Sequence, residues 1–174
     1  MAARHPICWL MTDARREGAL WGDLARVPRG GGVIFRHYDT PAAERQMLFE
    51  RVRRIARARG LVLVRAGAVP MRGEAGVHGQ RGRGLVTWPA HDRRQALAGV
   101  RAGATMLFVS PVFATRSHPG ARGIGPARAA TIARGLPVVV IALGGMDMRR
   151  WRRIRALGFD GFAAIDAWGR PRRT

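Results

Sequence analysis

Residues 84–113 read GLVTWPAHDRRQALAGVRAGATMLFVSPVF, and this stretch contains one complete strand–helix–strand unit. The apolar runs at 84–88 and 105–113 each predict a buried strand. The residues between them, 92–102, place apolar side chains at helical spacing, and Gly103 follows as a residue suited to the left-handed conformation that ends a helix. A helix between two strands joins them in parallel, so the stretch predicts a parallel α/β fold.

The same alternation continues along the whole chain. Further apolar runs predict strands at 7–12, 31–38, 61–66, 75–79, 137–145 and 161–168. Helices are predicted at 41–59, 126–134 and 147–157, each followed by a glycine before the next strand. Eight strands predict a compact (β/α)8 TIM barrel, with shortened connections around strands 3–5 because 67–74 and 79–84 are too short to hold full helices. An open doubly wound sheet ranks second, because it requires several of the eight runs to be loops.

The pattern predicts one domain, residues 1–169, followed by a basic tail at 170–174. Cys8 is the only cysteine, so no internal disulfide can form, and its apolar neighbours predict a buried thiol. The N-terminus lacks the features of a signal peptide, and the apolar run at 136–146 is too short to span a bilayer, so we expect a cytoplasmic protein. The helix at 41–59 is expected to bury a stripe formed by Met47, Leu48, Val52, Ile55 and Ala56.

The net charge is +20, and all 31 basic residues are arginine. A field of this size attracts phosphate groups of any kind, including those of nucleic acid. The arginines are spread along helical segments, however, and no aromatic side chains between them are placed to stack on bases. This distribution favours solvated helix faces over a nucleic-acid surface.

Polar residues follow most of the predicted strands, and the carboxyl ends of the strands form the functional face of a parallel barrel. Gly144 and Gly145 after strand seven, with the residues after strand eight, predict a phosphate site built from backbone amides. No His and Cys spacing is typical of zinc, and no Ser-His-Asp or Cys-His arrangement is supported. The candidate side chains at the strand ends are Asp13, Arg36, His37, Tyr38, Arg65, His78, Gln80, Thr87, His91, Ser110, Thr115, Ser117, His118, Asp147 and Asp166.

Two motifs resemble those of a known family. SPVFATRSHPG at 110–120 and PVVVIALGGMD at 137–147 occur in the order found in thiamine phosphate synthases and the related TenI-like thiazole tautomerases, which are (β/α)8 barrels. The resemblance is close over about 85–165 and extends more loosely to WLMTD at 9–13 and GGVIFRHYD at 31–39. It implies an enzyme of thiamine biosynthesis that joins an aminopyrimidine methyl pyrophosphate to a thiazole phosphate and releases pyrophosphate.

The resemblance also implies roles for individual residues. Arg36 matches the family's pyrophosphate-contacting arginine, and Thr115 and Ser117 match two hydroxyls used toward substrate and phosphate. His118 stands at the position of a lysine and completes the expected catalytic group. The remaining expectations are a phosphate cradle formed by Gly144, Gly145, Ile165 and Asp166, and a substrate pocket lined by Tyr38, Arg65, His78, Thr87, His91 and Ser110.

The sequence departs from the family pattern at several of these places. Ile34 and Tyr38 stand where the strand-two motif has glutamine and lysine, and Ser110 stands where the tautomerases have a histidine. The family implies Mg²⁺, but the aspartates that bind it after strands three and four are absent, so no metal ligand is assigned.

Two functions therefore stay open. The first is a synthase-like transferase, and the second is a non-catalytic or divergent TenI-like binder or regulator that has lost the magnesium–pyrophosphate half of the site. The expected partners are small phosphorylated thiazole and pyrimidine ligands, and neither nucleic acid nor a membrane. A homo-oligomer stays open as well.

Overall fold

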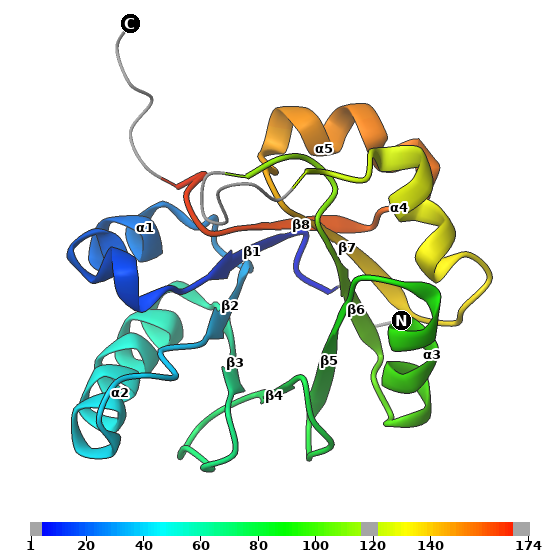
Figure 1. Ribbon diagram of the computed structural model, residues 1–174. Coiled ribbons are helices and arrows are strands. Elements are labelled where there is room, and N and C mark those ends of the chain that lie inside the picture. The colour runs from blue at the N-terminus through cyan, green and yellow to red at the C-terminus, as the bar shows by residue number, and fades with distance from the viewer. Residues whose placement is uncertain (1–4, 116–121, 169–174) are drawn as a thin grey trace, which may run out of the picture.

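Eight parallel strands close into a barrel in the computed structural model, which describes residues 5–115 and 122–168 (Figure 1). Strands that follow one another in the chain pair with one another, and β8 returns to pair with β1. This closure confirms the (β/α)8 TIM barrel and excludes the open doubly wound sheet. The strands are β1 (Cys8–Met11), β2 (Gly32–Phe35), β3 (Val62–Ala66), β4 (Gly76–His78), β5 (Leu85–Ala90), β6 (Met106–Val109), β7 (Val139–Leu143) and β8 (Gly161–Ala164).

Helices cover the outside of most of the barrel (Figure 1). The glycines predicted to end helices have positive φ, from +63° at Gly60 to +97° at Gly158, so these helix ends are confirmed. The turn and short helix between β1 and β2 were not predicted. The helical elements are η1 (Ala14–Ala19), α1 (Leu20–Arg26), α2 (Ala42–Arg59), α3 (Arg93–Arg101), α4 (Pro126–Ala133), α5 (Met148–Ile154) and η2 (Arg155–Leu157).

The predicted short connections lie on both sides of β4. In Figure 1 the chain passes from β3 through β4 to β5 by loops, with no helix outside this part of the described barrel. A Cβ on Gly82 would lie 2.6 Å from the Val77 side chain, so the loop packs directly on the outer face of β4 and keeps Val77 buried. The wall of the barrel is therefore shielded here without a helix.

Alternate side chains of each strand enter two separate cores. One core fills the barrel itself, where Trp9 of β1 meets Phe108 of β6 edge-on with ring centroids 5.5 Å apart. The other core lies between the barrel and the helices and takes the next residues along, such as Leu10 and Leu107. This alternation decides which residues at the strand ends point into the mouth of the barrel.

Helix α2 is rotated relative to the predicted stripe. Met47 is 62% exposed, whereas Phe49 and Arg45 are buried beside Leu48 and Val52. Arg45 donates from Nε to the His37 carbonyl at 2.9 Å and from Nη2 to the Ala66 carbonyl at 2.5 Å, so it ties the helix to the ends of β2 and β3. These hydrogen bonds explain why Arg45 is buried, although the predicted stripe contained only apolar residues.

Three further predictions concern the cysteine, membrane-spanning helices and the C-terminal tail. Cys8 is buried, as predicted, and burial raises the pKa of its thiol. Within the described residues, no helix is long and apolar enough to cross a membrane. The basic tail at 170–174 lies outside the described residues.

Candidate functional site

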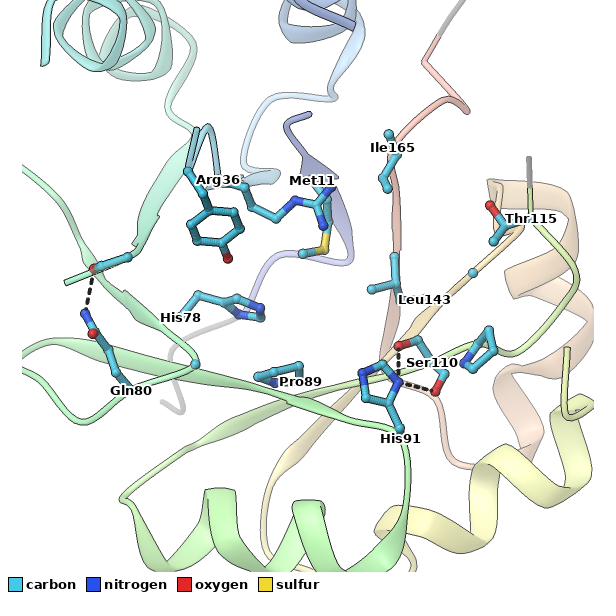
Figure 2. Close-up of a pocket in the computed structure, with 15 residues that line it drawn as sticks. Met11, Arg36, His78, Gln80, Pro89, His91, Ser110, Thr115, Leu143 and Ile165 are labelled. Carbon is cyan, nitrogen blue, oxygen red and sulfur yellow. Dashed lines mark hydrogen bonds between the residues drawn. The ribbon is translucent and has the colours of Figure 1, made fainter. Parts of the chain in front are cut away.

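A cavity of about 700 Å³ lies at the carboxyl ends of the strands, a volume typical of small-molecule sites (Figure 2). Its polar side chains come from β4 and from the segments that follow β2, β4, β5 and β6, and its apolar side chains come chiefly from β1, β5 and β7. The residues that line it are Met11, Arg36, Tyr38, Gly67, His78, Gly79, Gln80, Pro89, His91, Ser110, Pro111, Thr115, Leu143, Gly144 and Ile165.

Arg36 is the cation of this cavity. Its Nε donates to the Thr12 carbonyl at 2.8 Å, and its Nη2 lies 3.5 Å from Asp13 Oδ2. Asp13 is shared with Arg15, whose Nη2 lies 2.6 Å from the same oxygen, and this arginine pairing lowers the pKa of Asp13 to about 2. Two guanidinium groups thus face one carboxylate, so the three groups together carry a net charge of +1 at this side of the mouth.

His78 presents a neutral imidazole at the base of the cavity. Its Nδ1 lies 2.8 Å from Thr87 Oγ1, and the Thr87 hydroxyl donates its proton to the Val77 carbonyl at 3.3 Å. The hydroxyl must therefore accept from Nδ1–H, which leaves Nε2 as the acceptor of the ring. Burial, with a smaller contribution from the positive charge of Arg36, lowers the pKa of His78 to about 4, so the ring is neutral at pH 7.

His91 is oriented by Ser110 on the neighbouring strand end. Its Nδ1 lies 3.0 Å from the Ser110 carbonyl oxygen and 3.2 Å from Ser110 Oγ (Figure 2). A carbonyl can only accept, so Nδ1 carries the hydrogen and Nε2 is again the acceptor when the ring is neutral. In both imidazoles Nδ1 is engaged by a neighbouring oxygen, so Nε2 is the ring nitrogen that remains for a ligand.

The four residues predicted to form a phosphate cradle line a small hollow beside the cavity. Gly144, Gly145, Ile165 and Asp166 all line this hollow, together with Thr115. The hollow has a volume of about 10 Å³, which is enough for about one water. It shares Thr115, Leu143, Gly144 and Ile165 with the larger cavity, so a phosphate group at the cradle would lie largely in that cavity.

The Gly144–Gly145 turn also has a packing role. Both glycines have positive φ, +99° and +58°. A Cβ on Gly144 would lie 2.9 Å from Pro111 Cα, and one on Gly145 would lie 2.5 Å from the Ala114 carbonyl oxygen. The segment after β6 hydrogen-bonds to this turn, with Val112 N donating to the Leu143 carbonyl at 2.9 Å. The turn thus holds two strand ends of the site in close contact.

The structure brings most of the predicted site residues together. Arg36, Tyr38, His78, His91, Ser110 and Thr115 line the cavity. Ser117 and His118 lie outside the described residues.

Two predicted pocket residues lie elsewhere. Arg65 points to the outer face of β3, because Val64 and Ala66 on either side of it fill the barrel. It pairs there with Glu74, with Nε–Oε2 and Nη2–Oε1 distances of 2.5 and 3.0 Å. Thr87 points inward but is fully buried and contacts His78. Neither residue lines the cavity, although both were expected to.

Several lining residues were not predicted: Met11, Gly67, Gly79, Pro89, Pro111 and Leu143. Met11, Pro89 and Leu143 share the inward positions of their strands with Trp9, Thr87 and Ile141. The signal that would have found them is strand alternation, because attention to polar residues alone overlooks apolar ones that face a ligand.

The site does not fit the family's Mg²⁺. Magnesium prefers carboxylate and water oxygens in octahedral geometry. No Asp or Glu lines the large cavity, and among the described residues no three His, Cys, Asp or Glu side chains lie close enough together to hold a metal ion.

Comparison with known proteins places the match mainly in the second half of the chain. The family model described as thiamine monophosphate synthase matches residues 79–168. A thiamine-phosphate synthase of Chloroflexus aurantiacus is 30% identical over 156 residues, which cover 79% of this chain and 72% of the relative. The thiamine-phosphate synthase of Pyrococcus furiosus is 33% identical over 77 residues, which cover 44% of this chain and 37% of the relative.

Solved structures agree on the fold. The thiamine phosphate pyrophosphorylase of Pyrococcus furiosus superimposes with a TM-score of 0.77 at 20% identity, covering 92% of this chain and 85% of that protein. A nitroalkane oxidase of Streptomyces ansochromogenes superimposes with a TM-score of 0.71 at 14% identity, covering 94% of this chain and 66% of that protein. At these identities the likeness concerns the barrel alone.

Proposed function

Because the chain belongs to the thiamine monophosphate synthase family, we propose that it joins an aminopyrimidine methyl pyrophosphate to a thiazole phosphate. In this reaction the carbon–oxygen bond to pyrophosphate breaks, and pyrophosphate leaves with the electron pair. The lone pair of the thiazole nitrogen then forms the new carbon–nitrogen bond to the methylene carbon. The product is thiamine phosphate.

The observation that carries the proposal is one cavity with an arginine on one side and a glycine turn on the other. Arg36 enters the cavity from the end of β2 (Figure 2), and Gly144, which follows β7, also lines it. Two phosphorylated ligands need two separate anion sites, and the positive charge and the backbone turn are the two groups suited to that purpose.

The cavity residues suit the steps of this reaction. The Arg36 guanidinium is held in place by Thr12 before a ligand arrives, so it would stabilise charge on the departing pyrophosphate without reorganising. The Nε2 atoms of His78 and His91 would accept hydrogen bonds from the amino group of the pyrimidine. Met11, Leu143 and Ile165 provide apolar surface against which the two rings can be aligned for attack.

A second function is favoured by a different observation. The absence of Asp and Glu among the residues lining the cavity leaves the family's metal-dependent chemistry without ligands, while the glycine turn persists. A protein that binds the phosphorylated thiazole without turnover would have this combination. It would act as a binder or regulator.

The test is an assay of the purified protein with both substrates, in the presence and in the absence of Mg²⁺. We expect thiamine phosphate to form, and Arg36→Gln to lower kcat by about tenfold to a hundredfold through loss of a charge-assisted contact to the leaving group. Absence of product together with normal binding of thiazole phosphate would reject the transferase and support the binder.

A further inference from the structure

Two acidic side chains near the described strand ends, Asp13 and Glu74, are already bound by arginine. Asp13 accepts hydrogen bonds from Arg15 Nε at 3.0 Å and Arg15 Nη2 at 2.6 Å, and it also faces Arg36. Its side chain is 8% exposed. A divalent cation at this carboxylate would have to displace two guanidinium groups, and their positive charges would repel it.

Glu74, in the connection between β3 and β4, is occupied in the same way. Both of its oxygens accept from Arg65, and Oε2 also accepts from the Met71 amide at 2.9 Å. The pair lies outside the barrel wall, behind Gly67, whose carbonyl accepts from Arg65 as well. Glu74 therefore contributes no free carboxylate to the cavity.

Other acidic residues near the described strand ends cap helices or have too few acidic neighbours to hold a metal ion. Asp92 and Asp147 accept hydrogen bonds from Gln95 N and Arg150 N, and so cap the first turns of α3 and α5. Asp166 borders the small hollow at the end of β8. One carboxylate without neighbouring acidic ligands is a poor magnesium site.

The positive charge, by contrast, is available to a ligand. Arg36 is anchored through Nε, its side chain is 20% exposed, and its guanidinium points into the cavity beside Met11 (Figure 2). Arg15, Arg36 and Asp13 together carry a net charge of +1, whereas the Arg65–Glu74 pair is neutral. An anion that enters the cavity therefore meets a net positive charge at Arg36, because Asp13 is shared by two arginines.

We propose that this cavity binds the pyrophosphate group directly through Arg36 and without a divalent cation. The ligand class is taken from the proposed function, but the inference concerns how the group is bound and does not require turnover. Free pyrophosphate is then the preferred species, because complexation by Mg²⁺ removes part of the negative charge that Arg36 attracts.

The test is calorimetric titration of the full chain with inorganic pyrophosphate, in EDTA and in MgCl₂ at matched ionic strength. We expect the affinity in EDTA to be equal to or tighter than that in Mg²⁺. Tighter binding in Mg²⁺, or no binding in EDTA, would overturn the proposal. This comparison uses the unaltered protein, so it does not depend on whether any variant folds.

A pair of variants separates the site from the general charge of the protein. Arg36→Gln should weaken pyrophosphate binding in EDTA about tenfold or more. Arg57→Gln removes the same charge from an exposed position on α2 and should change the affinity by less than about twofold. Equal losses in the two variants would show that overall charge binds the anion, contrary to the proposal.

The result is distinguishable from failure of the transferase. Pyrophosphate binding in EDTA without formation of thiamine phosphate would reject the transferase and retain this inference. Formation of thiamine phosphate, with pyrophosphate binding only in Mg²⁺, would support the transferase and reject this inference.

Discussion

At the scale of single residues, the site depends on how a few side chains are held. Thr12 and Asp13 anchor Arg36, Thr87 orients His78, and Ser110 orients His91. Each partner determines which atom of the functional side chain remains for a ligand. For the two histidines that atom is Nε2, so the orientation of each imidazole follows from a hydrogen bond on its far side.

The depressed pKa of His78 predicts a pH dependence of stability. Between about pH 6.5 and pH 4 the unfolded chain takes up a proton at this residue while the folded chain does not, so stability falls as the pH drops through this window. The loss should reach up to about 3 kcal/mol at pH 4.

His78→Asn checks this prediction, because the amide can still donate to Thr87 but does not titrate. Urea unfolding measured from pH 7 to pH 4 should show a smaller fall in the free energy of unfolding for the variant. Parallel curves for the two proteins would contradict the assignment.

At the scale of secondary-structure elements, contacts made by loops hold the strand ends in place. The β3–β4 connection is closed by the Arg65–Glu74 pair and the hydrogen bond from the Met71 amide. The β7–α5 connection is closed by a glycine turn packed on the segment after β6. These connections bring the strand ends together and so shape the cavity.

Two glycines with nearly the same backbone angle allow the packing role of the β7–α5 turn to be measured. Gly144 and Gly158 have φ of +99° and +97°, but a Cβ on Gly158 would meet nothing within 4 Å. Gly158→Ala should cost about 1–2 kcal/mol from backbone strain alone. Gly144→Ala should cost about 1–3 kcal/mol more, because its Cβ would press on Pro111.

Urea unfolding of both variants measures this difference. Gly158→Ala is the matched control, since it changes the same residue type at the same φ without a contact. Equal destabilisation would mean that the segment after β6 moves aside at no cost.

At the scale of the whole molecule, the main feature is the large excess of positive charge. The chain carries 31 arginines against 11 acidic residues, and the described residues form five ion pairs. The excess arginines repel one another in the compact state. The ion pairs near the surface contribute little to stability in water.

We therefore expect the free energy of unfolding to increase as NaCl is raised from low to physiological ionic strength. Salt screens the repulsion among the many exposed arginines more than it weakens the few pairs that are buried. Thermal unfolding at a series of NaCl concentrations measures the effect. A decrease in the melting temperature over this range would show that attractive pairs outweigh the net repulsion.

The architecture could be predicted from local sequence patterns alone. Apolar runs, helical spacing and helix-ending glycines are local patterns, so they identified eight βα units and the missing helices around β4. The motifs after strands six and seven likewise indicated the family, and Arg36, His78 and His91 were placed at the correct end of the barrel. Short elements such as α1 escaped because seven residues carry little periodicity.

Which strand-end residues face the cavity depends on long-range packing that no local pattern reveals. Arg65 was expected in the pocket, but strand alternation turns it outward to Glu74, and Thr87 is buried beneath His78. The contact between Asp13 and Arg36 was equally hidden, because the two residues are 23 positions apart in the chain. Closure of the barrel sets the direction of each side chain and the partner of each charge, and neither property is encoded by any single segment.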